Sequence, residues 1–152
     1  MPMPWTYRHA SREWQAFLAD VKDRMDLVSD NMAYTAVDGV LQVFRRRLTP
    51  QQGIAFANVL PSVLRAIFVK DWEIGAAPVP FGTRADLVAE VKAVRRHHNL
   101  APDTAIEDTA WALWRCVNHR EFEAVLDDLP PEARAFWAVQ VEDPAELATR
   151  MV

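Results

Sequence analysis

The chain has 152 residues, 51% of them hydrophobic and 25% charged, which is typical of one soluble globular domain. Its formal charge of −4 argues against nucleic-acid binding, and its single cysteine, Cys116, excludes an intrachain disulfide. The N-terminal stretch MPMPWTYRHASREW has no long apolar run, and no later segment approaches the ~20 apolar residues that span a bilayer. We therefore expect one domain over residues 1–152, in a reducing compartment, the cytoplasm.

The first predicted helix starts within this N-terminal stretch, with Ser11 placed to cap it. Its apolar residues recur at helical spacing, at Trp14, Phe17, Leu18, Val21 and Met25. A second helix carries on one face Val37, Val40, Leu41, Phe44 and Leu48. Both patterns predict helices that bury one side against a common core.

The stretch TPQQ predicts the start of a third helix. Thr49 is its N-cap, Pro50 takes the first helical position, and Gln52 follows three residues after the cap, as in a capping box. Pro61 disfavours helical geometry at Leu60, so the third helix ends there and Pro61 opens a fourth. The apolar face of this fourth helix consists of Val63, Leu64, Ile67 and Phe68.

Residues 73–82, EIGAAPVPFG, hold two of the four glycines and indicate a connector. The helical plan then repeats. Thr83 is predicted to cap a helix, with Asp86 at its third position, and the stretch PDTAIEDTAWALWRCV predicts the next helix. The stretch NHRE then places Asn118 as a cap three residues before Glu121.

One offset relates the two halves of the chain. Pairs of residues that lie 69 positions apart are Thr49 and Asn118, Gln52 and Glu121, Leu60 and Leu129, Pro61 and Pro130, and Arg65 and Arg134. We therefore predict an all-α helical bundle of two tandem four-helix repeats, residues 11–72 and 83–141, related by a pseudo-twofold axis. A short extra C-terminal helix after the second repeat is left open.

Each LP pair is predicted to form a corner, where proline ends one helix and starts the next. An F/L-x-x-x-V helix paired with A-x-x-x-x-x-L and LP-x-x-x-R occurs twice, and this pattern resembles the bacterial family called domain of unknown function 2267. The matching residues are Phe17, Val21, Ala36, Leu60, Pro61 and Arg65, then Leu87, Val91, Ala105, Leu129, Pro130 and Arg134. The resemblance covers about residues 14–141. It implies an all-helical, duplicated bacterial domain and supplies no catalytic residues.

Few residues suggest chemistry. His97 and His98 are adjacent, so on a helix they point about 100° apart and cannot hold one metal as an i, i+4 pair would. Two basic side chains there suit a helix C-terminus. Cys116 lies one turn from His119, which keeps a catalytic thiol open, but a half-buried inert thiol is the favoured interpretation. We expect no metal, cofactor or catalytic residue.

The arginine runs 45–47 and 95–96 are interpreted as solvated helix faces and partners of helix C-termini, because acidic residues surround them and no glycine-rich phosphate loop accompanies them. Arg65 and Arg134 lie on the flanks of their helices. Each is expected to reach an acidic group within its own repeat, with a packed stem and a solvated head.

Trp111 and Trp114 are the most informative residues for function. They lie about 130° and 70° from the centre of their helix's apolar face. Their counterparts 69 positions earlier are Gln42 and Arg45, so both positions are expected to tolerate water. Two tryptophans there predict a cover of some kind.

Three covers are open for these tryptophans. The favoured one is internal, from the N-terminal arm with Trp5 or from the connector with Trp72 and Phe81. A homodimer or partner contact is the second, and a small-ligand pocket is the third.

Three functions follow from these alternatives. The leading hypothesis is a non-enzymatic helical interaction or scaffold module, as a homodimer or with a protein partner, that uses Trp111 and Trp114. The second is a small-molecule or lipid-binding regulator with a pocket between the repeats near Trp111. The third is an enzyme. Neither nucleic-acid binding nor a membrane span is expected.

Overall fold

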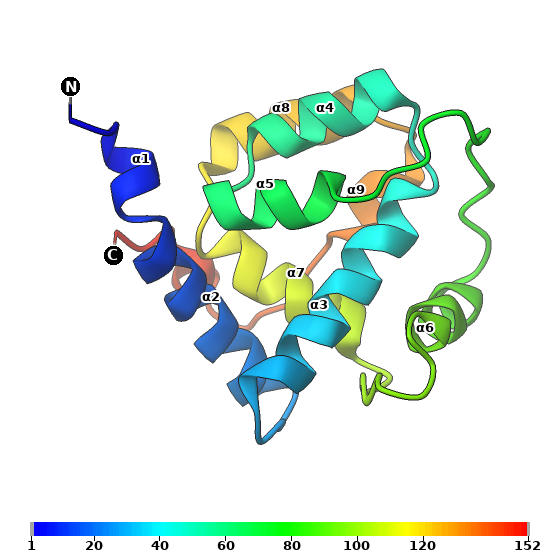
Figure 1. The fold of residues 1–152 in the computed structure, drawn as a ribbon, viewed down its shortest axis with the longest axis horizontal. Coiled ribbons are helices and arrows are strands. Elements are labelled where there is room, and N and C mark those ends of the chain that lie inside the picture. The colour runs from blue at the N-terminus through cyan, green and yellow to red at the C-terminus, as the bar shows by residue number, and fades with distance from the viewer. Residues whose placement is uncertain (1, 152) are drawn as a thin grey trace.

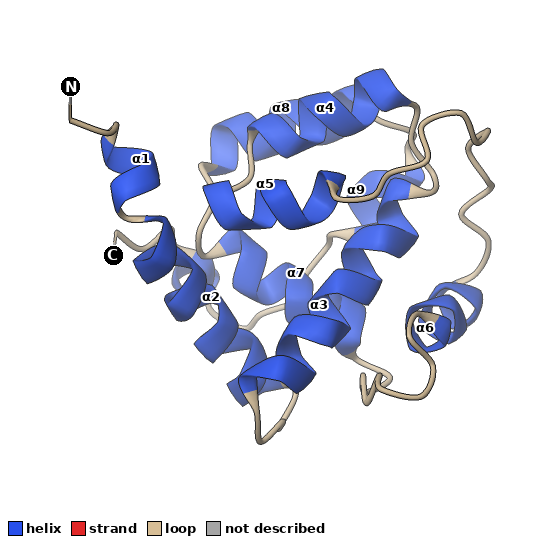
Figure 2. Ribbon diagram, in the orientation of Figure 1, coloured by secondary structure: helices blue, strands red, loops and turns tan. Residues whose placement is uncertain are grey.

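The computed structural model describes residues 2–151, which form α-helices and one 3-10 turn with no strand among them, as Figure 2 shows. The expected all-α class is confirmed. The helices are α1 (Trp5–Arg8), α2 (Ala10–Arg24), α3 (Asp30–Arg45), α4 (Pro50–Asn58), α5 (Ser62–Val69), α6 (Arg84–Ala93), α7 (Ala105–Trp114), α8 (His119–Asp128) and α9 (Glu132–Phe136). The 3-10 turn η1 spans Pro144–Leu147.

Helices α3 and α7 form the centre of the bundle. Helix α3 packs against α2, α5, α6 and α7, and α7 packs against α2, α3 and α6 (Figure 1). Helices α4 and α8 lie together across one end, where α5 packs on α4 and α9 on α8. Both central helices bury residues on nearly all sides, which is the pattern of helices enclosed by others.

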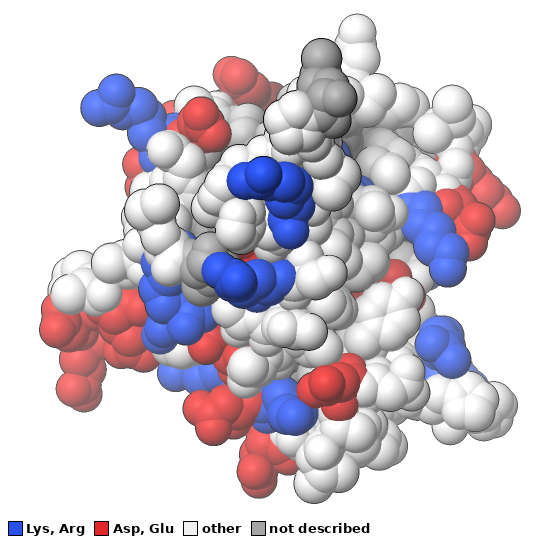
Figure 3. All heavy atoms as spheres, turned by 60° about the vertical axis from the view of Figure 1, so that its left-hand side comes forward, with Lys and Arg blue, Asp and Glu red and all other residues white. Residues whose placement is uncertain are grey.

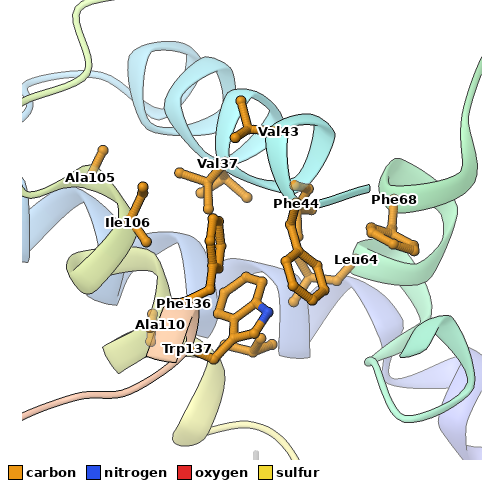
Figure 4. Close-up of a cluster of buried hydrophobic side chains, with 14 of the residues drawn as sticks. Val37, Val43, Phe44, Leu64, Phe68, Ala105, Ile106, Ala110, Phe136 and Trp137 are labelled. Atoms are coloured by element: carbon orange, nitrogen blue, oxygen red, sulfur yellow. The ribbon is translucent and has the colours of Figure 1, made fainter. Parts of the chain in front are cut away.

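The core is rich in aromatic rings (Figure 4). The ring centroid of Phe44 on α3 lies 4.8 Å from that of Phe56, 4.9 Å from Phe136 and 5.2 Å from Trp137. These separations are those of favourable tilted and edge-to-face pairs. Trp137 is fully buried, and its indole N–H has no hydrogen-bond partner in the described part of the chain. Large aromatic rings from both halves of the chain therefore pack in one core.

Side-chain caps start several of the helices. The Thr49 hydroxyl accepts the Gln52 N–H at 3.2 Å, and the Gln52 side chain accepts the Thr49 N–H at 2.9 Å, which closes a capping box. Thr83 closes a second box. Asn118 caps α8 through one bond, from the Glu121 N–H to its Oδ1 at 3.0 Å.

The predicted cap at Ser11 is wrong. The N-cap position lies two residues earlier, at His9, which makes no side-chain bond, and helix α2 starts at Ala10. Helix α1 ends at Arg8, so the chain passes from α1 into α2 with a single residue between them. Ser29, which caps α3 by accepting the Met32 N–H at 3.2 Å, was not identified from the sequence.

Both LP pairs lie at corners between helices. Helix α4 ends at Asn58, two residues before the predicted end, and α5 starts directly after Pro61. In the second half α9 starts at Glu132, after a second proline, and is only five residues long. Leu60 and Leu129 are buried at these corners.

The two arginines that follow the LP pairs bind differently. Arg65 donates from Nε to the Ala57 carbonyl at 3.1 Å and from a terminal nitrogen to the Leu60 carbonyl at 3.2 Å. The predicted acidic partner of Arg65 is therefore wrong, because two backbone carbonyls, one in the last turn of α4 and one at the corner behind it, take the guanidinium instead. Arg134 does reach an acid, Asp127, in an ion pair within its own half.

The segment after α9 returns along the outside of α7. The Thr149 hydroxyl donates to the Val117 carbonyl at 2.6 Å, and the Arg150 N–H donates to the Arg115 carbonyl at 3.0 Å. Over residues 2–151, no helix combines the length and the apolar character that a membrane crossing needs.

Candidate interaction groove

Trp111 is buried inside the chain. Its side chain is 7% exposed, and its indole N–H donates to Glu146 in η1 at 2.8 Å. The guanidinium carbons of Arg24 and Arg115 lie 4.6 Å and 4.4 Å from its ring centroid, as in cation–π contacts. Trp111 therefore has the internal cover that the sequence analysis favours.

The groups that form this cover differ from those expected. The expected covers were Trp5 in the N-terminal arm and Trp72 with Phe81 in the connector. The groups recorded over the indole instead come from α2, from the end of α7 and from the segment after α9. Helical periodicity could not reveal this, because that segment has no helical pattern and reaches Trp111 through a tertiary contact.

A small ionic cluster ties the same three parts of the chain together. Asp20 on α2 pairs with Arg150 and lies 3.4 Å from Nε of Arg115. Asp108 on α7 accepts the Thr104 hydroxyl at 2.7 Å and lies 3.8 Å from Nε of Arg24. Burial raises the pKa of both carboxyl groups, and the neighbouring cations and hydrogen bonds oppose that rise.

Trp114 lies at the edge of the same helix and is half-buried. Its indole N–H donates to the Trp137 carbonyl at 2.8 Å. Its ring meets His119 and Phe122 edge to face, at centroid distances of 5.1 Å and 4.7 Å. The His119 Nε2 bonds the Trp114 carbonyl at 2.8 Å. Trp114 is therefore anchored internally but keeps part of its surface in contact with solvent.

That surface opens into a shallow groove of about 730 Å³ between α8 and the segment after α9. Apolar side chains make up much of its lining, and the charged ones come from α8 and α9. The lining residues are Trp114, His119, Glu123, Arg134, Ala138, Val139, Gln140, Val141, Pro144 and Leu147. We call this feature the Trp114 groove.

The part of the chain that builds the groove is acidic. Residues 119–147 hold eight Asp or Glu and two Arg. Glu123 lines the groove, and Glu142 follows the lining residue Val141. Both are exposed and neither forms an ion pair within residues 2–151. On the face that carries α1 and the C-terminus, basic side chains lie near the centre and acidic ones mostly around them (Figure 3).

Gln42 and Arg45, which lie 69 positions before Trp111 and Trp114, line a second surface hollow, apart from the Trp114 groove. The connector, including Trp72, also lines this hollow. Arg45 donates to the Phe68 carbonyl at 2.9 Å and the Lys70 carbonyl at 2.8 Å. Arg45 and Phe68 stand 69 positions before Trp114 and Trp137, which are joined by an equivalent bond.

The predicted solvation of the run 45–47 is wrong for two of its three arginines, because Arg45 and Arg47 are buried. Arg47 forms two bonds to the Glu90 carboxylate, at 2.7 Å and 2.6 Å, and Arg46 adds a third at 2.9 Å. These bonds lower the pKa of Glu90, with the bond from Arg47 as the largest cause. The pairs join the C-terminus of α3 to α6.

The remaining candidate residues do not form a reactive group. The Cys116 thiol donates to the Leu113 carbonyl at 3.3 Å, and burial raises its pKa. His119 bonds a different carbonyl, so the suggested thiol–imidazole pair is not formed. His97 and His98 are exposed in the turn after α6. Among residues 2–151, no group of three or more His, Cys, Asp or Glu side chains is arranged to hold a metal ion.

Comparison with known proteins agrees with the resemblance. The model of a family described as an uncharacterized conserved protein, DUF2267, matches residues 14–136. No curated protein matches the chain.

Proposed function

The chain belongs to the DUF2267 family, and from the groove we propose that it is a non-enzymatic helical module that binds a segment of another protein chain. The observation that carries this proposal is the Trp114 groove, which is open, is lined largely by apolar side chains and is built from an acidic stretch of the chain. Aromatic surface of this kind is enriched at protein interfaces. The groove fits a short segment that carries aromatic and basic side chains.

The contacts of the polar groups support a role without catalysis. Cys116 and His119 each bond a backbone carbonyl, and burial raises the pKa of the thiol. A nucleophilic thiol needs a partnered base and a lowered pKa. The arrangement is therefore suited to holding structure rather than to attacking a substrate.

We also propose that the two halves are copies related by a pseudo-twofold axis. Helix α2 packs on α7, and its counterpart α6 packs on α3, the counterpart of α7. The central pairs α3 with α7 and α4 with α8 each join an element to its own counterpart. The equivalent bonds from Arg45 to Phe68 and from Trp114 to Trp137 support the same relation.

A second candidate is a regulator that binds a small molecule or lipid. The volume of the groove, about 730 Å³, is in the range of ligand pockets and favours it. Its shallow, open form favours a peptide. Aliphatic or aromatic carboxylic acids that raise the melting temperature of the unmodified chain, but not that of a groove-filled variant, would favour the second candidate.

A peptide display screen with a blocked variant tests the main proposal. Ala138 is exposed and lines the groove, so Ala138→Trp should fill it without removing any core side chain. Ala85, exposed on α6, gives the matched control Ala85→Trp. We expect enriched peptides with aromatic and basic residues that bind the unmodified chain and the Ala85→Trp control but not Ala138→Trp. Peptides that bind all three proteins equally, or no enrichment, would contradict the proposal.

A further inference from the structure

The N-terminal arm, residues 2–12, exposes large apolar side chains. Met3, Trp5 and Tyr7 are 54%, 49% and 48% exposed. Within residues 2–151 the aromatic partner of Trp5 is the His9 ring, which is tilted against it at a centroid distance of 4.5 Å. Helix α1 projects from the bundle at the end of α2 (Figure 1). One short projecting segment therefore carries three large exposed apolar side chains.

The arm is also basic. It contains Arg8 and Arg12 and no acidic residue. The two arginines border one shallow hollow together with His9. Within residues 2–151 neither of them takes part in an ion pair. The arm thus combines aromatic and basic side chains, the two properties that suit the Trp114 groove.

The arm is held away from the groove of its own chain. Only His9 separates α1 from α2, and α1 packs on α2. The Thr6 hydroxyl lies 3.4 Å from the Ser62 hydroxyl at the start of α5. In this position Trp5 and Tyr7 face solvent, and none of the arm residues lines the groove. The arm is therefore presented outward.

We propose that the arm of one copy docks in the Trp114 groove of a second copy, with Trp5 over the apolar floor and Arg8 and Arg12 toward Glu123 and Glu142. This inference rests on the proposed function and names the occupant of the groove. Charge complementarity supports it, because the arm has two arginines without ion pairs, and two carboxylates without ion pairs lie on the groove side, Glu123 in the lining and Glu142 next to it in the chain. Arg134, which also lines the groove, is already paired with Asp127.

The contact is reciprocal, since each copy has one arm and one groove. A twofold dimer of this kind contains the same contact twice, which makes two small contacts act together. Each contact involves only a short segment, so the dimer forms at high protein concentration and dissociates on dilution. Its charged part weakens as salt screens the arginines from the carboxylates.

Analytical ultracentrifugation of the full chain over a concentration series tests the dimer. We expect a monomer–dimer equilibrium that Trp5→Ala weakens at least tenfold, because a central tryptophan often dominates an interface. Ala138→Trp, which fills the groove, should weaken it as much. Ile74→Ala removes an apolar side chain outside the arm that is even more exposed than Trp5, and it should leave the equilibrium unchanged. Unfolding midpoints of all three variants establish that each one folds.

A charge exchange tests the geometry. Arg8→Glu with Arg12→Glu makes the arm acidic, and Glu123→Lys with Glu142→Lys makes the rim basic. Each double variant alone should be monomeric, and an equimolar mixture should restore the dimer, because both arm-to-groove contacts in the mixed dimer join opposite charges.

A chain that stays monomeric throughout the series would overturn the inference, as would a dimer that survives Trp5→Ala or a mixture that does not associate. An arm that folds into its own groove would likewise appear as a monomer. In each of these cases the peptide display screen can still support the proposed function, if the enriched peptides bind the unmodified chain but not Ala138→Trp. Failure of the dimer can therefore be distinguished from failure of the proposed function.

Discussion

Glu90 joins two arginines to the end of α6, and its ionisation should be visible in the stability of the protein. Its pKa is lowered from 4.5 by the bonds from Arg47 and Arg46. A lowered folded-state pKa means that the unfolded chain binds the proton more readily. The stabilisation by the carboxylate is therefore complete above pH 4.5 and is lost as the pH falls through the folded-state value. Urea unfolding of the parent chain and Glu90→Gln should differ most near neutrality and converge in acid.

Asp108 provides a control for Glu90, because its pKa shifts in the opposite direction and its effect on stability should therefore have the opposite pH dependence. Burial raises its pKa above 3.8, so the folded state binds the proton more readily than the unfolded chain. Its contribution is complete below pH 3.8 and is lost as the pH rises through the folded-state value. The parent chain should thus gain stability relative to Asp108→Asn on acidification. Parallel pH profiles for Asp108→Asn and Glu90→Gln would contradict this assignment.

Gly53 is a second residue whose role can be measured. A Cβ at this position would lie 2.0 Å from the Trp72 ring, so the indole packs directly on the bare helix backbone. Alanine raises helix propensity by about 1 kcal/mol over glycine. Displacing Trp72 from Gly53, and from Arg45 at 5.6 Å, costs about 1–3 kcal/mol as overpacking. We expect the second effect to exceed the first, so Gly53→Ala should lower the urea midpoint.

The effect of Gly53→Ala on stability should change from destabilising to stabilising when Trp72 is removed. In a Trp72→Ala background the clash is gone and only the helix propensity remains, so Gly53→Ala should then stabilise by about 1 kcal/mol. A substitution that destabilises equally in both backgrounds would show that Trp72 is not the reason for the glycine.

At the scale of elements, the caps of α4 and α8 can be compared directly. Thr49→Ala and Asn118→Ala should each destabilise by about 1 kcal/mol, the usual loss for an N-cap bond. Thr49 is part of a reciprocal box and Asn118 makes a single bond, so we expect Thr49→Ala to cost more. Equal urea midpoints for both variants and the parent would contradict a capping role for either residue.

The sequence predicts these elements well, because their signals are local. Threonine, proline and glutamine at fixed spacing identify the start of α4, and Thr83 with Asp86 identifies the start of α6. The predicted helix ends are less accurate. Helix α4 ends two residues before Leu60, where the sequence predicted its end, and α9 is a short helix of five residues that starts directly after Pro131. The bond from Arg65 to carbonyls was missed because it depends on where two helices meet.

The groove was not predictable in the same way. Its walls come largely from residues 138–147, which follow the last helix and carry no helical period. The burial of Arg45 and Arg47 also depends on neighbours that are distant in sequence, the carbonyls after α5 and Glu90 on α6. The two tryptophans were the available signal. They identified one helix that contributes to the groove, through Trp114, but angles on one helix cannot show what covers it.

At the scale of the molecule, each half completes the core of the other. Helix α2 of the first half packs on α7, and α6 of the second packs on α3. A unit of about 60 residues buries a marginal core alone. We therefore regard the contact between the halves as the main source of stability, and residues at that contact should be the most sensitive to substitution.

A substitution at Trp111 tests whether the contact between the halves is the main source of stability. Trp111→Gln introduces the residue found at the equivalent position of the first half, but here the indole is buried under Arg24, Arg115 and Glu146. Truncating buried tryptophan costs about 3–5 kcal/mol, a large part of a typical total of about 5–15 kcal/mol. We expect a large fall in the urea midpoint. An unchanged midpoint would contradict this internal packing of Trp111.

Trp114 should behave differently, because the equivalent Arg45 already shows what an arginine does at this position. Arg45 donates to the Phe68 carbonyl, as Trp114 donates to the Trp137 carbonyl. Trp114→Arg can keep the hydrogen bond to the Trp137 carbonyl. Trp114→Met places an apolar chain of similar length to the arginine stem there, but it has no hydrogen-bond donor. A retained hydrogen bond stabilises by about 1 kcal/mol. We therefore expect Trp114→Arg to unfold at higher urea than Trp114→Met, while a higher midpoint for Trp114→Met would contradict the equivalence of the two halves at this position.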